Sequence, residues 1–254
     1  MEVHHHTHHP KKWNEYFWEF FMLFLAVFCG FLAEIQVEHY VEHQREKKYV
    51  FSLKEELEND ILKFDQSLKR VQEVHPLIDS FYNNLINAAA YNYIIKSRWN
   101  VYINEQRVTY LPNLSVITQI KNSGNLRLIT NHELLKSVIE YESSISREYA
   151  YIFQGVQDAA DKLYTFEDEY CNYKLFSESL SKALNELMTG NEHTVQGLKY
   201  DMPLLIKDPI VLNKFANTAV NYKGRLRGYV ARVIKAKKQA DLIIKMIQKE
   251  YHFK

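Results

Sequence analysis

A short apolar run near the N-terminus constrains this chain more than any other feature. Residues 20–33 read FFMLFLAVFCGFLA and carry no charged side chain, with Glu19 before them and Glu34 after them. An α-helix rises about 1.5 Å per residue and a bilayer core is about 30 Å thick, so a span needs roughly 20 mostly apolar residues. The run reaches this length when Tyr16–Trp18 is added and Glu19 is accepted inside the helix. We therefore predict a transmembrane helix over residues 13–34.

The composition around the run separates this prediction from its alternatives. The run is apolar on all sides, which is typical of a helix in lipid and not of one lying in the membrane plane. Trp13 and Trp18 lie at its start, where indole rings favour the headgroup level. A buried helix of a soluble fold and a cleaved signal peptide remain alternatives, although Phe31 and Leu32 make residues 29–33 a poor cleavage site.

The charges beside the run predict its orientation. Lysines stand before it, acidic residues follow it, and the next basic residue comes only at Arg45; the flanking charges are Lys11, Lys12, Glu34, Glu38 and Glu42. The positive-inside rule then places residues 1–12 in the cytoplasm as a His-rich leader. We expect residues 35–254 to form the main domain on the outer side, which is the periplasm if the membrane is a bacterial inner membrane.

The rest of the chain is predicted to be all-α. Seven glycines and five prolines in 254 residues leave long uninterrupted segments, and such segments are helices. Lys plus Arg number 32 against 31 Asp plus Glu, so the overall charge indicates no particular partner. Cys29 and Cys171 lie far apart in the chain, with Cys29 inside the apolar run, and we expect no disulfide. The predicted fold is a transmembrane helix that continues into an antiparallel bundle of long helices.

The first predicted helix of this bundle follows directly from the span. Val50, Leu53, Leu57, Ile61, Phe64, Leu68 and Val71 recur at intervals of three and four residues, as in a coiled coil. We expect this helix to be interrupted at His75-Pro76, because proline removes a backbone donor and disfavours helix in the residue before it. A second helix is predicted over residues 77–110.

Capping signals mark the later helices. A short helix is predicted over residues 115–121, with Gly124 just past its end. Asn131 is predicted to cap a helix that continues to about residue 188 with a bend near Gly155, and its many aromatic side chains are expected to pack in the core. Asp208 and Pro209 predict the start of the last helix.

Opposite charges predict which helices are neighbours. Residues 207–254 hold 12 basic and 3 acidic side chains, whereas residues 34–60 hold 4 basic and 8 acidic ones. We therefore expect the first and last long helices to run side by side. Lys249 and Lys254 would then lie close to the headgroups, where a basic residue is worth about 1 kcal/mol on an anionic surface.

Two stretches resemble a known group of proteins. Residues 13–34, from Trp13-Asn14-Glu15-Tyr16 to Phe31-Leu32-Ala33-Glu34, resemble the anchor of uncharacterised bacterial membrane proteins, often from the Bacteroidetes, that begin with a His-rich leader. Residues 122–131 (NSGNLRLITN), with the leucines and tyrosine after them, resemble a segment of that group. Leu205–Pro209 and Ile243–Tyr251 match it in placement. The resemblance implies an N-terminal anchor and a helical extracytoplasmic domain, and it supplies no activity.

The sequence shows no pattern typical of an enzyme. It has no phosphate-binding glycine loop, no Gly-x-Ser-x-Gly elbow and no Cys-x-x-Cys or His-Glu-x-x-His motif. The leader histidines, and His39 with His43 one helical turn apart, could hold a metal, but a polar leader and a solvated helix face are the simpler interpretations. We predict no catalytic residue, no metal and no cofactor. The basic last helix could bind nucleic acid, which an outward-facing domain would not meet.

Two features inside the span suggest a function. Ala26 and Gly30 form a small-xxx-small pair that lets helices approach closely, so we expect a homo-oligomer. The leading hypothesis is a membrane-anchored structural or interaction protein, an oligomeric scaffold or accessory subunit that contacts lipid and other envelope proteins. The alternative is a subunit of an ion-conducting, proton-conducting or transport assembly that uses Glu19, which otherwise reaches the cytoplasmic interface.

Overall fold

The computed structural model describes residues 12–96, 109–172 and 201–252, together with 181, 185, 188 and 189. The chain divides into two compact units, residues 1–50 and 51–254, and each is described by itself. The protein is all-α, as predicted, with one short two-stranded pairing. The helix α1 (Trp13–Ile86) contributes to both units; the other elements are η1 (Ala88–Tyr91), β1 (Ile94–Lys96), α3 (Ser115–Asn122), η2 (Asn125–Leu128), α4 (His132–Ser143), η3 (Ser144–Tyr149), α5 (Ala150–Tyr170), β2 (Asp201–Pro203) and α7 (Pro209–Tyr251).

In the described part of the first unit, α1 is the only regular element. It begins at Trp13, and the carbonyl of Lys12 accepts a hydrogen bond from the backbone N–H of Glu15 at 2.8 Å. The helix passes without a break through the apolar run and into the charged residues that follow it. The predicted helix over residues 13–34 is therefore present, and it continues directly into the next helix, as predicted.

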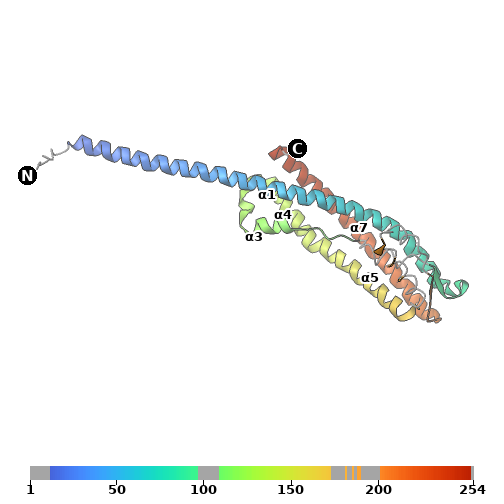
Figure 1. Cartoon of the computed structure of the whole chain (residues 1–254). Helices are drawn as coiled ribbons and strands as arrows, with labels where there is room; N and C mark the ends of the chain where they lie inside the picture. Colours follow the sequence, from blue (N-terminus) through green and yellow to red (C-terminus); the bar gives the residue numbers. More distant parts are fainter. Residues whose placement is uncertain are drawn as a thin grey trace, which may run out of the picture. The chain divides into compact units, whose positions relative to one another are not determined.

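The second unit is a bundle in which α7 runs antiparallel to α1 (Figure 1). Two ion pairs fix the direction, because Lys237 lies 2.6 Å from Asp65 and Lys223 lies 2.6 Å from Asp79. The prediction that the first and last long helices are neighbours is confirmed within this unit. The acids that pair across the contact lie beyond residue 60, outside the stretch whose charge suggested it.

A continuous rod of α4, η3 and α5 packs against both α1 and α7 and runs antiparallel to α7 (Figure 1). Asn131 at the start of the rod donates to Glu250 at 3.1 Å, and Phe166 near its end stacks on Phe215 at 5.2 Å. The ring of Phe215 also meets Phe81 of α1 edge to face at 5.1 Å. One aromatic side chain of α7 thus packs against both neighbouring helices.

The core positions of α1 in this unit keep a strict alternation of four and three residues. The buried side chains at these positions are Leu53, Leu57, Asp60, Phe64, Ser67, Val71, Val74, Ile78, Phe81 and Leu85. Facing them, α7 buries several alanines, which allow close helix packing; these are Ala216, Ala219, Ala236 and Ala240.

Pro76 does not end the first helix, contrary to the prediction. α1 continues through it to Ile86. Proline removes one internal hydrogen bond, at a cost of about 3 kcal/mol in a helix interior. The buried positions Val74 and Ile78 on either side of Pro76 stay in register, and the burial of their side chains offsets this cost.

The predicted helix over residues 77–110 is also wrong. After η1, Asn92 and Tyr93 adopt left-handed backbone conformations, and β1 then pairs antiparallel with β2, with Ile95 opposite Met202. α5 likewise stops at Tyr170 rather than near residue 188, because Cys171 is extended and bridges to Leu204. Each helix therefore ends where the chain joins this small β pairing.

The predicted caps are confirmed. Asn131 Oδ1 accepts hydrogen bonds from the N–H groups of Glu133 and Leu134 at 3.1 and 3.0 Å. Asp208 accepts one from Ile210 at 2.8 Å, with proline in the first turn of α7. Gly124 adopts a φ of 71° just beyond α3, as predicted. The bend expected near Gly155 is replaced by the π-helical segment η3, ahead of that glycine.

Candidate functional site

The five residues predicted to matter in the membrane segment are all exposed on α1. Trp13 is 84% and Trp18 is 60% exposed, and none of the most apolar part of the helix is buried within the structure. Glu19, Ala26 and Gly30 follow at intervals of seven and four residues, so the helix presents them on one face. The two tryptophans lie on other faces. By length and composition, α1 is able to cross a membrane.

Phenylalanines cover the face of this segment opposite Glu19, Ala26 and Gly30. Their rings stack along the helix, Phe20 on Phe24 at 6.4 Å and Phe24 on Phe28 at 6.0 Å. Large and small side chains are thus separated onto opposite faces. A helix that contacts only lipid does not require this separation of large and small side chains.

The second candidate site is a polar cluster inside the bundle core. It comprises a carboxylate and a serine from α1, two tyrosines from the α4–α5 rod, one from α7 and one from the segment before α3: Asp60, Ser67, Tyr141, Tyr149, Tyr229 and Tyr110. Asp60, Tyr141 and Tyr229 are each 0% exposed. Buried polar groups are costly unless they are paired, so their hydrogen bonds decide whether the core is stable.

Tyr110 is the centre of this cluster. Its phenol donates a short hydrogen bond to Asp60, its backbone N–H donates to the Tyr229 hydroxyl at 2.7 Å, and its carbonyl accepts from Tyr149 at 2.5 Å. The Tyr141 hydroxyl donates to the second oxygen of Asp60 at 3.2 Å. The cluster therefore fixes a non-helical segment within a helical bundle.

Burial raises the pKa of the Asp60 carboxyl above its ordinary value, and the nearby carboxylate of Glu56 raises it further. Hydrogen bonds from Tyr110, from the backbone of Asn113 and from Tyr141 act in the opposite direction. The pKa of the Tyr110 phenol is raised as well, first by burial and then by the neighbouring Asp60. The arrangement suits a proton held between a carboxyl and a phenol.

The sequence analysis missed this cluster. It placed Ile61 and Leu68 in the apolar stripe, but both are only half-buried, and Asp60 and Ser67 occupy the core positions. Strict alternation of four and three residues from Leu53 to Val71 passes through Asp60 and Ser67, and that was the available signal. The expectation that the aromatic side chains pack in the core holds for Tyr149, whereas Tyr151 is 72% exposed.

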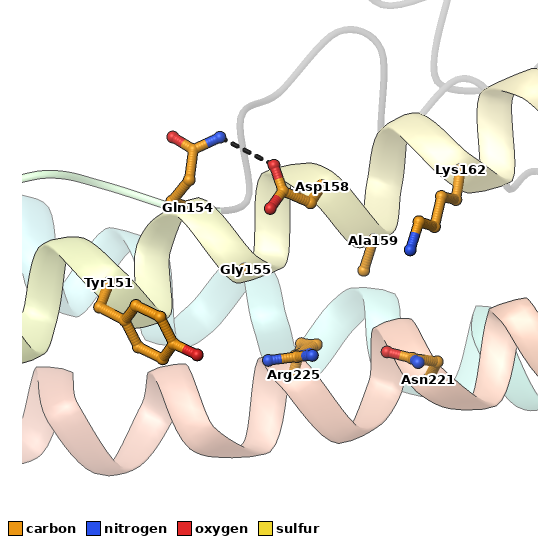
Figure 2. A pocket seen from close by; sticks show the side chains of 8 residues that line it. All are labelled: Tyr151, Gln154, Gly155, Asp158, Ala159, Lys162, Asn221 and Arg225. Atoms are coloured by element: carbon orange, nitrogen blue, oxygen red, sulfur yellow. Dashed lines mark hydrogen bonds between the residues drawn. The ribbon is translucent and has the colours of Figure 1, made fainter.

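A surface pocket of about 190 Å³ lies between α5 and α7 (Figure 2). The Arg225 side chain lies against Gly155, where an added Cβ would come within 3.3 Å of its Nη1 atom. Asp158 accepts a hydrogen bond from Gln154 at 2.9 Å, on the rim of the same pocket. The lining is polar, charged and open to solvent, and it brings together no nucleophile with a base.

The structure provides no metal site within its described residues. No group of three or more His, Cys, Asp or Glu side chains there is placed to hold an ion. His43 Nδ1 lies 3.0 Å from Glu46, so its ring already has a partner on its own helix. Residues 1–11 of the His-rich leader lie outside the described residues. Comparisons with protein families, with curated proteins and with solved structures found no match to this chain.

Proposed function

We propose that this protein is a membrane-anchored structural or interaction protein, in which the N-terminal part of α1 spans a bilayer and the bundle of residues 51–254 holds or docks a partner. The observation that carries the proposal is the apolar segment of α1, in whose most apolar stretch no residue is buried inside the protein. A soluble fold rarely leaves so large an apolar surface in water. Lipid is the environment that this surface fits.

The architecture of the bundle supports a role in holding a partner rather than in catalysis. The buried carboxyl of Asp60 and the half-buried phenol of Tyr110 bind each other and hold the segment before α3 in place. We propose an oligomer in the inner membrane of a bacterium, with residues 1–12 in the cytoplasm, the bundle in the periplasm and other envelope proteins as partners. The resemblance to bacterial membrane proteins with a His-rich leader agrees with this assignment. The resemblance itself remains a prediction.

Extraction of membranes with alkaline carbonate tests the anchor. The wild-type chain is expected to stay in the pellet. Leu25→Lys combined with Phe28→Lys places two charges in the middle of the span, at about 2.5–3.5 kcal/mol each, and is expected to release it. The matched control is Ile234→Lys with Leu242→Lys, two exposed positions on α7, which should stay in the pellet. A wild-type chain that stays in the supernatant would overturn the proposal.

Cysteine labelling tests the orientation. With Cys29 replaced by serine, a cysteine at the exposed position of Lys238 is expected to react with a membrane-impermeant maleimide on intact spheroplasts. Cys171 is buried, and burial raises the pKa of its thiol to about 12, so it contributes little background. Labelling that requires prior lysis would place the bundle in the cytoplasm and contradict the proposed orientation.

Glu19 supports a second candidate function, a path for ions or protons through an assembled group of spans. It lies seven residues before Ala26, so it faces the side on which helices are expected to meet. Glu19→Gln separates the two functions. A conducting assembly predicts ion flux in vesicles that falls with this substitution, whereas a scaffold predicts background flux for both chains and unchanged assembly.

A further inference from the structure

One face of α1 keeps the same spacing well beyond the apolar run. We define the α1 seam as the positions that follow one another at intervals of four and three residues from 19 to 44: Glu19, Leu23, Ala26, Gly30, Ala33, Val37, Tyr40 and Gln44. All of them are exposed. An alternation of four and three is the repeat by which helices pair in a left-handed coiled coil.

The outer half of the seam, from Val37 to Gln44, lies beyond the predicted membrane segment. Contact with lipid therefore does not explain its exposed apolar side chains. Seven of the fifteen residues from 34 to 48 are charged. Yet Val37 and Tyr40 on the seam are 62% and 66% exposed, and Val41 beside them is 39% exposed. A charged helix in water gains nothing from such a strip unless another surface covers it. The need for a partner therefore continues past the membrane segment.

The seam is not the stripe that the bundle uses for its own core. In residues 53–85 the buried positions of α1, such as Leu57 and Phe64, follow the same repeat one residue out of step with the seam. A shift of one residue turns a helix by about 100°. The seam and the core stripe therefore occupy different positions of the repeat along α1, and the core positions of the bundle do not continue the seam.

The side chains along the seam suit a second copy of the same helix. Between residues 35 and 43 the positions that flank it are Gln36, Val41 and His43, while the acids Glu38 and Glu42 point elsewhere. A face that pairs with itself must avoid opposing like charges, and between residues 35 and 43 this one does. Glu19, at the start of the seam, is its one charged position. Inside the apolar run the seam narrows to Ala26 and Gly30, which permits close approach, and an added Cβ at Gly30 meets nothing within 4 Å.

We infer that two copies of this chain pair in parallel along the α1 seam, from the membrane segment out to Gln44. The inference rests on the proposed membrane anchor, which gives both copies the same direction. To the proposed anchor, this inference adds the partner, which is a second copy of the chain, the parallel orientation of the two copies, and a contact between them outside the bilayer. The phenylalanines of the opposite face then remain turned toward lipid.

Disulfide scanning of the full-length chain in membranes tests the seam. Cys29 is replaced by serine, single cysteines are placed at each position from 36 to 44, and the membranes are oxidised. A disulfide needs Cβ atoms about 3.5–4.5 Å apart, so the cross-linked fraction should peak at 37, 40 and 44. It should be several-fold lower at 38, 39 and 42. A flat profile, or a cross-linked band that contains another protein, would overturn the inference.

The mass of the detergent-solubilised chain provides the second measurement. The wild type should have twice the mass of one chain, Tyr40→Glu should shift it to that of one chain, and the matched control His39→Glu should leave it unchanged. A wild type that is monomeric, or larger than a dimer, would contradict the pairing while leaving the anchor intact. A wild type that is not in the membrane fraction would instead contradict the proposed function, so the two failures are distinguishable.

Discussion

The hydroxyl of Tyr149 lies 3.1 Å from the hydroxyl of Tyr229. The two tyrosines are 80 positions apart in the chain and belong to antiparallel helical segments. Both hydroxyls also bind the backbone of Tyr110, which belongs to neither helix. Long-range polar contacts of this kind do not add much stability by themselves. They specify which groups must meet, because each unpaired member would carry the full cost of its burial.

Tyr229→Phe tests the cluster directly. The substitution keeps the ring and removes the oxygen that accepts the Tyr110 N–H and bonds to Ser67 at 2.7 Å. Leaving a buried donor unpaired costs about 1–3 kcal/mol, so we expect the free energy of unfolding to fall by that amount in urea titration. Tyr151→Phe, at a position 72% exposed, removes an equivalent hydroxyl and should change stability by less than about 0.5 kcal/mol. Equal effects of the two substitutions would contradict the role of the cluster.

Asp60 predicts a pH dependence of stability. Burial raises the pKa of its carboxyl in the folded state above the unfolded value of about 3.9. The folded chain therefore holds this proton more tightly, and the stabilisation it gives is complete below pH of about 3.9 and is lost as the pH rises through the folded pKa. Asp60→Asn cannot lose a proton, so the difference in unfolding free energy between variant and wild type should shift in favour of the variant with rising pH. A difference that is constant between pH 4 and pH 8 would contradict the raised pKa.

Two glycine substitutions are expected to act in opposite directions. Gly124 has a φ of 71°, a conformation that costs an alanine about 1–2 kcal/mol, so Gly124→Ala should destabilise the protein by about that amount. Gly224 is in the interior of α7, with nothing within 4 Å of an added Cβ. Gly224→Ala should raise stability by about 0.8–1 kcal/mol through helix propensity. Thermal or urea unfolding measures both, and effects of the same sign would contradict the assignment of these backbone conformations.

The ion pair between Asp65 and Lys237 is expected to contribute little. Both side chains are partly exposed, at 52% and 31%, and exposed pairs are typically worth about 0.2–1 kcal/mol. A double-mutant cycle with Asp65→Asn and Lys237→Gln should therefore give a coupling energy in this range that falls in high salt. A coupling well above it that persists in salt would show that the pair is less solvated than its exposure indicates.

Local signals predicted the starts of helices better than their ends. Asn131 and Asp208 were identified as caps because a side-chain oxygen beside free N–H groups is a purely local interaction. The ends at Ile86 and Tyr170 depend on the pairing of β1 with β2 and of Cys171 with Leu204, more than 30 residues away in each case. No local pattern in the sequence predicts that β1 pairs with β2 or that Cys171 pairs with Leu204. Pro76 shows the reverse case, since burial on both sides of it overrides a strong local signal.

The polar cluster could not be predicted from the sequence as a site. Asp60 and Ser67 sit at regular core positions of α1, but a polar residue in a heptad is common and names no partner. Tyr110 comes from a non-helical segment and was predicted to be helical. The hydrogen bonds exist because three helices and this segment converge, and only the tertiary structure brings them together.

The π-helical segment η3 provides a final test, because it corrects the phase of the α4–α5 rod. Buried positions before it, such as Val138 and Tyr141, and those after it, such as Tyr149 and Val156, follow the same four-and-three repeat, displaced by one residue. In a regular α-helix, at about 100° per residue, Tyr149 would lie about 80° away from the face of Tyr141. One extra residue absorbed by the wider turns of η3 brings both tyrosines into the core.

Deletion of the exposed residue Ser146 should therefore convert η3 to a regular α-helix and keep both tyrosines in the core, because it removes the one residue that η3 absorbs. Tyr141 and Tyr149 are then seven residues apart, which is the spacing of one face in the four-and-three repeat. Deletion of the exposed residue Asp161 from the regular helix α5 is the matched comparison, because it turns the buried Leu163 away from the core by about 100°. We expect the Asp161 deletion to lower the free energy of unfolding by about 2–5 kcal/mol, as for the loss of a buried leucine, and the Ser146 deletion to lower it much less. Ser146→Ala keeps the residue count and should be within about 0.5 kcal/mol of the wild type. If the Ser146 deletion were as disruptive as the Asp161 deletion, the π-helical segment would not be what sets the phase of the rod.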